Sequence, residues 1–170
     1  VTSVLSNILS EKGYQVSILS IFEGLSPNFE ISNNIKLYQL FSQKVSMKFN
    51  FFNSIVRIRK FVIEHEIETF IIVDSISCIF TIPALLGLKI NHICWEHFNL
   101  EMNLGSKFRG IARLLATKYC DHIVVLTRTD KQKWLHYYKD INAKLHTIYN
   151  PNSFSVVPKV NSNSKNVLFV

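Results

Sequence analysis

The stretch that decides the fold is His92-Ile93-Cys94-Trp95-Glu96-His97-Phe98-Asn99, residues 92–99. An apolar run ends abruptly in two ionisable side chains, Glu96 and His97, where a short buried strand is expected to open into a loop. In an open parallel sheet, ligands bind in the crevice beyond the carboxyl ends of the strands. We therefore expect Glu96 and His97 to lie where the protein binds its ligands.

On both sides of this stretch, short apolar strands alternate with amphipathic helices. We expect strands at residues 14–22, 35–41, 69–73, 91–95, 122–126 and 145–149, and helices at 1–13, 44–68, 76–87, 106–119 and 127–138. Gly13 is placed to end the first helix, and Thr127 with Asp130 fits a capping box at the start of the last. The alternation predicts an α/β fold with a Rossmann-like, mostly parallel sheet and helices on both faces.

Right-handed crossovers send the carboxyl ends of parallel strands to one edge of the sheet. That edge collects Asp74-Ser75, residues 96–99, Thr127 and Asn150. In the helix at 106–119, an apolar stripe of Phe108, Ile111, Ala112, Leu115 and Tyr119 is expected to face the core.

Composition describes a packed globular domain, with 48% hydrophobic and 18% charged residues in a chain of 170. The three cysteines are widely spaced in apolar contexts, which favours buried thiols in a reducing compartment over disulfides. No cysteine or histidine pair has zinc spacing, and the five glycines form neither a Walker loop nor a dinucleotide fingerprint. No apolar run is long enough to span a bilayer, and no signal peptide precedes the first helix.

The formal net charge of +7 suggests an anionic partner. Residues 31–63 contain no acid and interleave cations with phenylalanines, so this stretch is either a core-packing helix with a solvated basic face or a segment that contacts anionic lipid. A second basic stretch at 107–118 either serves an anionic acceptor or keeps its helix soluble. The residues assigned to membrane or anion contact are Lys48, Arg57, Arg59, Lys60, Arg109 and Arg113. Nucleic acid is not expected as a partner, because no recognition motif accompanies the charge.

Glu96 and His97 have two interpretations. An imidazole beside a carboxylate at the mouth of a cleft can hydrogen-bond sugar hydroxyls or share a proton. Alternatively, His97 caps the loop and Glu96 is solvated. We expect structural roles for the other histidines, which are His65, His92, His122, His136 and His146.

Five motifs occur in the order and spacing of a known family. They are residues 1–16, Trp95-Glu96-His97, residues 114–127 with Asp130 beyond them, residues 148–151 and residues 166–170. Together they resemble the N-terminal, acceptor-side half of a family 4 retaining glycosyltransferase of the GT-B fold. The Gly-Gly loop and first strand of that family would precede Val1. Residues 1–150 would form the acceptor-binding domain, and residues 151–170 a linker and the first strand of a C-terminal donor-binding domain.

The resemblance implies that the full-length protein moves a sugar from a nucleotide-sugar to an acceptor with retained anomeric configuration, without a metal or other cofactor. His97 would line the cleft and contact the donor sugar. Glu96 and Asn99 would orient His97 or the acceptor, and Thr127 and Asn150 would shape the floor and rim of the cleft. The 170-residue chain alone is expected to be inactive.

The basic, aromatic segment suits a lipid-linked glycan acceptor at the cytoplasmic face of the membrane, in a surface-polysaccharide pathway. Two alternatives stay open at this point. One is a nucleotide-sugar epimerase, also built on the GT-B plan, and the other is a non-catalytic flavodoxin-like binding domain.

Overall fold

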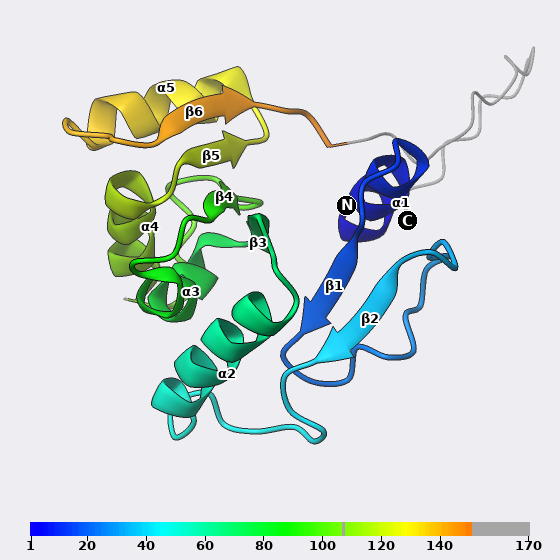
Figure 1. Cartoon of the computed structure of the whole chain (residues 1–170). Helices are drawn as coiled ribbons and strands as arrows, with labels where there is room; N and C mark the ends of the chain where they lie inside the picture. The colour runs from blue at the N-terminus through cyan, green and yellow to red at the C-terminus, as the bar shows by residue number, and fades with distance from the viewer. Residues whose placement is uncertain (107, 151–170) are drawn as a thin grey trace, which may run out of the picture.

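A computed structural model describes residues 1–106 and 108–150 of the chain, and Figure 1 shows its strands and helices. The elements are α1 (Thr2–Glu11), β1 (Ser17–Ser20), β2 (Lys36–Gln39), α2 (Phe51–Glu64), β3 (Thr69–Val73), the 3₁₀ helix η1 (Ser75–Ser77), α3 (Cys78–Leu85), β4 (Asn91–Trp95), α4 (Phe108–Tyr119), β5 (His122–Val125), α5 (Arg128–Tyr137) and β6 (Lys144–Thr147). The linker and last strand predicted at 151–170 lie outside the described residues.

The strands form two parallel sheets, a pair β1-β2 and a four-stranded sheet in the order β3-β4-β5-β6. Cys94 in β4 pairs with Ile72 on one side and Ile123 on the other, which fixes the register of the four-stranded sheet. No ladder joins the two sheets within the part of the chain that the structure describes. The strand expected to precede Val1 stays a prediction. The α/β, Rossmann-like arrangement with flanking helices is the fold class that the sequence predicts.

The carboxyl ends of the four-stranded sheet are tied together beyond the last residue of each strand. The amide of Asp74 donates to the carbonyl of Trp95 at 2.9 Å, and the amide of Glu96 donates to that of Val124 at 2.8 Å. Because these bonds continue the ladder, the first residue of each following loop is held as firmly as the strand. Figure 1 shows the arrowheads of β4, β5 and β6 pointing in one direction, so the loops that follow them share one edge.

The main core lies on the face of the sheet that carries Ile72, Cys94 and Ile123, against side chains of α3, α4 and α5. Trp134 of α5 is fully buried there. The three cysteines are free and buried, as the sequence predicts. A second cluster joins β1 and β2 to the helices, with Leu40 and Phe41 packed against α2 and α3.

Some boundaries differ from those expected. The helix predicted at 44–68 begins at Phe51, because Asn50 closes a turn in which both its amide and its side-chain nitrogen donate to the carbonyl of Ser46. It ends at Glu64, followed by Glu66 with a positive φ of 50°, which no helix continues through. The helix predicted at 76–87 divides into η1 and α3 and ends two residues after Pro83.

Gly13 ends α1 as predicted, in a left-handed conformation with φ of 85°. The amide of Tyr14 donates to Leu9 and that of Gly13 to Ser10, which is the Schellman arrangement. Gly110, within α4, has ordinary helical φ, and neither glycine has an atom near the position of an added Cβ.

We therefore predict opposite effects for the same substitution at these two glycines. Gly13→Ala should lower the free energy of unfolding by roughly 1–2 kcal/mol, because an L side chain is strained in the left-handed region. Gly110→Ala should raise it by up to about 1 kcal/mol, because alanine is the better helix former. Urea denaturation of the two variants measures both effects, and equal shifts would contradict the left-handed assignment of Gly13.

Candidate functional site

Asp74, the first residue after β3, has a strained backbone and a fully engaged carboxylate. Its φ of 89° is unusual for a residue with a side chain. One carboxylate oxygen accepts from the amide of Ile76 at 3.1 Å and caps η1. The same carboxylate forms a bidentate ion pair with Arg109, whose Nη1 and Nη2 donate to Oδ1 and Oδ2 at 2.5 and 2.9 Å. Such bidentate pairs have strict geometry, so Arg109 holds this edge in place.

Glu96, the first residue after β4, is a buried carboxylate with only 1% of its surface exposed. One oxygen accepts from the hydroxyl of Ser75 and from Nε of Arg113, the latter at 3.0 Å. The other accepts from the amide of Phe98 at 3.0 Å and lies 3.7 Å from Arg109. A buried charge is tolerated only when it is paired and hydrogen-bonded, and these contacts meet that requirement.

The alternative interpretation of Glu96 as a solvated residue is therefore wrong, because its carboxylate is buried among protein donors. Its contacts instead bracket His97, with the amide of Glu96 bound to β5 and the amide of Phe98 bound to the carboxylate. Of the two roles implied for Glu96, orienting His97 is the one that its position supports.

Arg109 and Arg113, one turn apart on α4, face the interior and are 5% and 1% exposed. This overturns two expectations, since neither residue lies on a basic surface that could contact a membrane or an anionic acceptor. It also corrects the predicted apolar stripe of α4. Phe108, Ile111 and Tyr119 are exposed, and the buried face is made of Arg109, Ala112, Arg113, Ala116 and Thr117.

His97 is half-buried, and its ring lies parallel to that of Trp95 with centroids 6.4 Å apart. Burial lowers the pKa of His97 below its usual value, although the charges of Glu96 and Asp74 act in the opposite direction. This shift favours the neutral form of the imidazole. Its Nε2 atom is enclosed and has no hydrogen-bond partner among the described residues, which also holds for Nε1 of Trp95.

The other residues predicted for the site lie at the same edge. Asn99 is exposed, and its side chain accepts from the amide of Glu101 at 3.1 Å. Thr127 caps α5 by accepting from the amide of Asp130 at 3.0 Å, and Asn150 is exposed beyond β6. Their roles toward a substrate stay predictions.

Only half of the capping box forms. The carboxylate of Asp130 accepts no hydrogen bond from the amide of Thr127. It accepts instead from the amide of Leu100 at 2.9 Å. Asp130 thereby ties the loop after β4 to the start of α5, a long-range contact that local pattern cannot reveal.

The basic residues of α2 divide into two groups. Arg57 donates to the carbonyl of Leu40 and lies over the ring of Phe41, and Arg59 donates to two carbonyls at the end of α3. These two guanidiniums are structural links, so they are less available for lipid than predicted. Lys48 and Lys60 are exposed.

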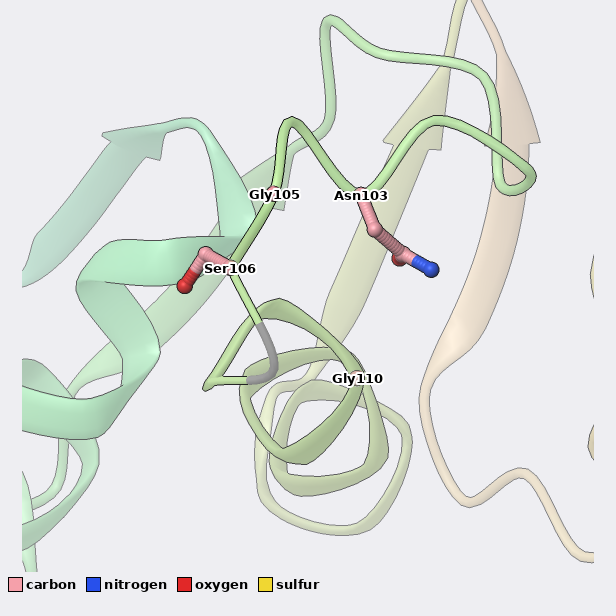
Figure 2. A pocket seen from close by; sticks show the side chains of 4 residues that line it. All are labelled: Asn103, Gly105, Ser106 and Gly110. Carbon is pink, nitrogen blue, oxygen red and sulfur yellow. The ribbon is translucent and has the colours of Figure 1, made fainter.

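Two hollows of the described surface have linings that do not indicate a ligand. One of about 170 Å³ is lined by Asn103, Gly105, Ser106 and Gly110, and Figure 2 shows the side chains of Asn103 and Ser106 pointing to opposite sides. A larger open hollow of about 660 Å³ lies before β2 and includes two carboxylates, Glu11 and Glu30. Neither brings cations or convergent donors together.

Two absences hold for residues 1–106 and 108–150. No three histidine, cysteine or carboxylate side chains gather closely enough to hold a metal ion. None of the helices there has the length and apolar character needed to cross a bilayer.

The sequence analysis named Arg109, Arg113, Asp74 and Ser75 but missed their roles as partners of the buried carboxylates. A signal for the first two was present, because arginines and alanines at 109, 112, 113 and 116 make a helical stripe of their own. Of the histidines predicted to be structural, His92 is buried and lies 3.2 Å from the hydroxyl of Thr81.

The four-stranded parallel sheet with flanking helices is consistent with a Rossmann-like domain of the kind that forms half of a GT-B glycosyltransferase. The family model of Glycosyltransferase Family 4 matches residues 1–152, and the chain belongs to that family. It is 34% identical over 155 residues to an uncharacterized glycosyltransferase of Haemophilus influenzae. The match covers 91% of this chain and 42% of that relative, so the chain spans less than half of the relative's length.

We predict that Glu96→Ala lowers the free energy of unfolding by about 3–5 kcal/mol, because it leaves the guanidinium of Arg113 buried without its counter-ion. Glu101→Ala is the matched control, since its carboxylate pairs with Lys133 at 2.6 Å but is 72% exposed. That loss should be at most about 1 kcal/mol. Denaturation of the two variants compares them, and similar losses would show that the buried pairs do not stabilise the fold.

Proposed function

We propose that the full-length protein is a retaining glycosyltransferase that moves a sugar from a nucleotide-sugar to a lipid-linked glycan acceptor, and that this chain is its acceptor-side half. Membership of family 4 supports sugar transfer. The observation that carries the proposal furthest is His97, whose imidazole sits at the carboxyl edge of the sheet on a backbone fixed on both sides.

In the proposed reaction, His97 binds a hydroxyl of the donor sugar. A neutral imidazole has one nitrogen that donates and one that accepts, which suits a hydroxyl group. Nε2 of His97 has no protein partner among the described residues and is enclosed, so a substrate oxygen would satisfy it once a rotation of the side chain exposes this nitrogen. The role of the protein is then to hold acceptor hydroxyl and anomeric carbon close together, which accounts for large rate gains without a covalent step.

The two carboxylates beside His97 do not suit a double displacement. Asp74 is held by two nitrogens of Arg109, and Glu96 is buried between Ser75 and Arg113. A glycosyl-enzyme intermediate needs an ionised carboxylate that can reach the sugar. The proposed retention therefore does not pass through a carboxylate of these two residues.

An exposed surface on and before α2 supports a membrane-associated acceptor. We call it the α2 patch, and its members are Lys48, Phe49, Phe52, Val56, Lys60 and Ile63. Phe49 and Phe52 are 86% and 79% exposed, so they are not needed to fill the core. Aromatic rings at headgroup level and flanking lysines are the features of a helix that lies on anionic lipid. We propose that the patch rests on the cytoplasmic face of the membrane, where a surface-polysaccharide precursor would be extended.

The alternatives are less well supported. The family to which the chain belongs is one of glycosyltransferases, which favours transfer over a flavodoxin-like binding role. Epimerisation is distinguished by assaying for an isomerised free nucleotide-sugar in the absence of acceptor.

We predict that His97→Ala lowers the rate of transfer by the full-length protein by at least about 10²-fold, because a positioned group at the reacting sugar is lost. Labelled sugar incorporated into acceptor measures the rate, and the anomeric proton of the product reports whether configuration is retained. His136→Ala, on the exposed side of α5, should transfer normally. Full activity of His97→Ala would remove this residue from the site, and the 170-residue chain alone should show no turnover.

We also predict that Phe49→Ser with Phe52→Ser weakens binding of the full-length protein to vesicles containing anionic lipid. Each cation of the patch contributes about 1 kcal/mol near such a surface, so added salt should weaken binding of the unaltered protein too. Phe29→Ser is the control, because Phe29 is 72% exposed but lies outside the patch. Vesicle co-sedimentation makes the comparison, and binding indifferent to charge and salt would exclude this surface.

A further inference from the structure

The loop after β4, residues 96–106, is built around one side chain of α4. Arg113 is 1% exposed, and all of its nitrogens are engaged by this loop. Nε donates to Glu96 at 3.0 Å, Nη1 donates to the carbonyl of Leu100 at 2.5 Å and to the side chain of Asn103 at 3.3 Å, and Nη2 donates at 3.1 Å to the carbonyls of both Asn99 and Met102. A guanidinium has five N–H donors, and here each has an acceptor.

These contacts are unusual for a surface loop, whose carbonyls ordinarily point to water. Three carbonyls turn inward to a single cation, so the path of the chain from Asn99 to Met102 follows the planar fork of Arg113. A lysine carries the same charge on a single nitrogen and cannot reproduce five donors in a plane.

The same guanidinium is linked to His97 through Glu96. The carboxylate that accepts from Arg113 also accepts from the amide of Phe98, the residue that follows His97. Midway along the loop, Asp130 accepts from the amide of Leu100. His97 thus lies between Glu96 and Leu100, two residues that are each bound to a buried charged side chain.

We propose that Arg113 is a positioning residue for sugar transfer, acting by shaping the loop that carries His97 and Asn99 and not by touching substrate. This inference rests on the proposed function of His97. It goes beyond that proposal by assigning the placement of the imidazole to Arg113, a residue of α4. The loop itself shields the side chain of Arg113 from solvent.

Arg113→Lys in the full-length protein tests the proposal. The kcat for transfer should fall by about 10²-fold with little change in KM for the nucleotide-sugar, because displacement of a reacting group by about 1 Å has that effect on rate. Hydrogen exchange should become faster at the amides of residues 98–103 and stay unchanged in β4 and β5. Lys118→Met, on the same helix but with its side chain 37% exposed, should alter neither quantity.

Each other outcome overturns the proposal. A wild-type kcat would show that the loop needs no guanidinium. A lower kcat without faster exchange in the loop would mean that Arg113 contacts substrate, and faster exchange throughout the sheet would mean that it only stabilises the fold. If Arg113→Lys does not fold, Ser75→Ala serves as the test in its place, because it removes only the hydroxyl that donates to Glu96. This variant should show a smaller fall in kcat and a smaller rise in exchange at residues 98–103.

Failure of the proposed function would appear differently. Normal transfer by His97→Ala in the same assay, or no transfer by the unaltered full-length protein, would contradict the proposed function irrespective of the behaviour of the Arg113 variants.

Discussion

The structure of the candidate site depends on the burial of one carboxylate, that of Glu96, between a serine and two arginines. Removing an ionised carboxylate from water is costly, so the fold must supply compensating charge and hydrogen bonds at that position. It does so from two elements far apart in the sequence, the turn after β3 and the inner face of α4. The pairs Asp74–Arg109 and Glu96–Arg113 therefore join the ends of two neighbouring strands to one helix.

This arrangement separates the task of support from the task of binding. The charged groups beside His97 are occupied with one another, and the imidazole has one nitrogen without a partner among the described residues. A neutral, firmly held group on a rigid strand end suits recognition of a sugar hydroxyl better than a mobile charged one would. The exposed phenylalanines and lysines of the α2 patch belong to a different part of the chain, on and before α2.

Much of the fold was predictable because its signals are local. The apolar strands, the glycine that ends α1 and the threonine that caps α5 follow from short-range sterics and hydrogen bonding, and the structure contains each of them. The face of α4 was predicted wrongly, because its apolar stripe was assumed to be the buried one. Alanines and two arginines occupy the buried face instead. Arginine is rarely buried unless a carboxylate or other acceptor pairs with it, and the local pattern of α4 does not reveal such partners.

By itself the sequence determined the order of elements, the parallel sheet and the edge at which Glu96, His97 and Thr127 emerge, since hydrophobic periodicity and right-handed crossovers dictate these. Only the tertiary structure decided which of these residues face outward. Glu96 is buried while Asn99 is exposed, although both follow the same strand. Ser75 and Arg113 bind the side chain of Glu96, whereas Arg113 binds only the backbone carbonyl of Asn99. The two contacts to the side chain of Glu96 span 21 and 17 residues of sequence, a separation at which side-chain pairing is set by packing of the whole domain.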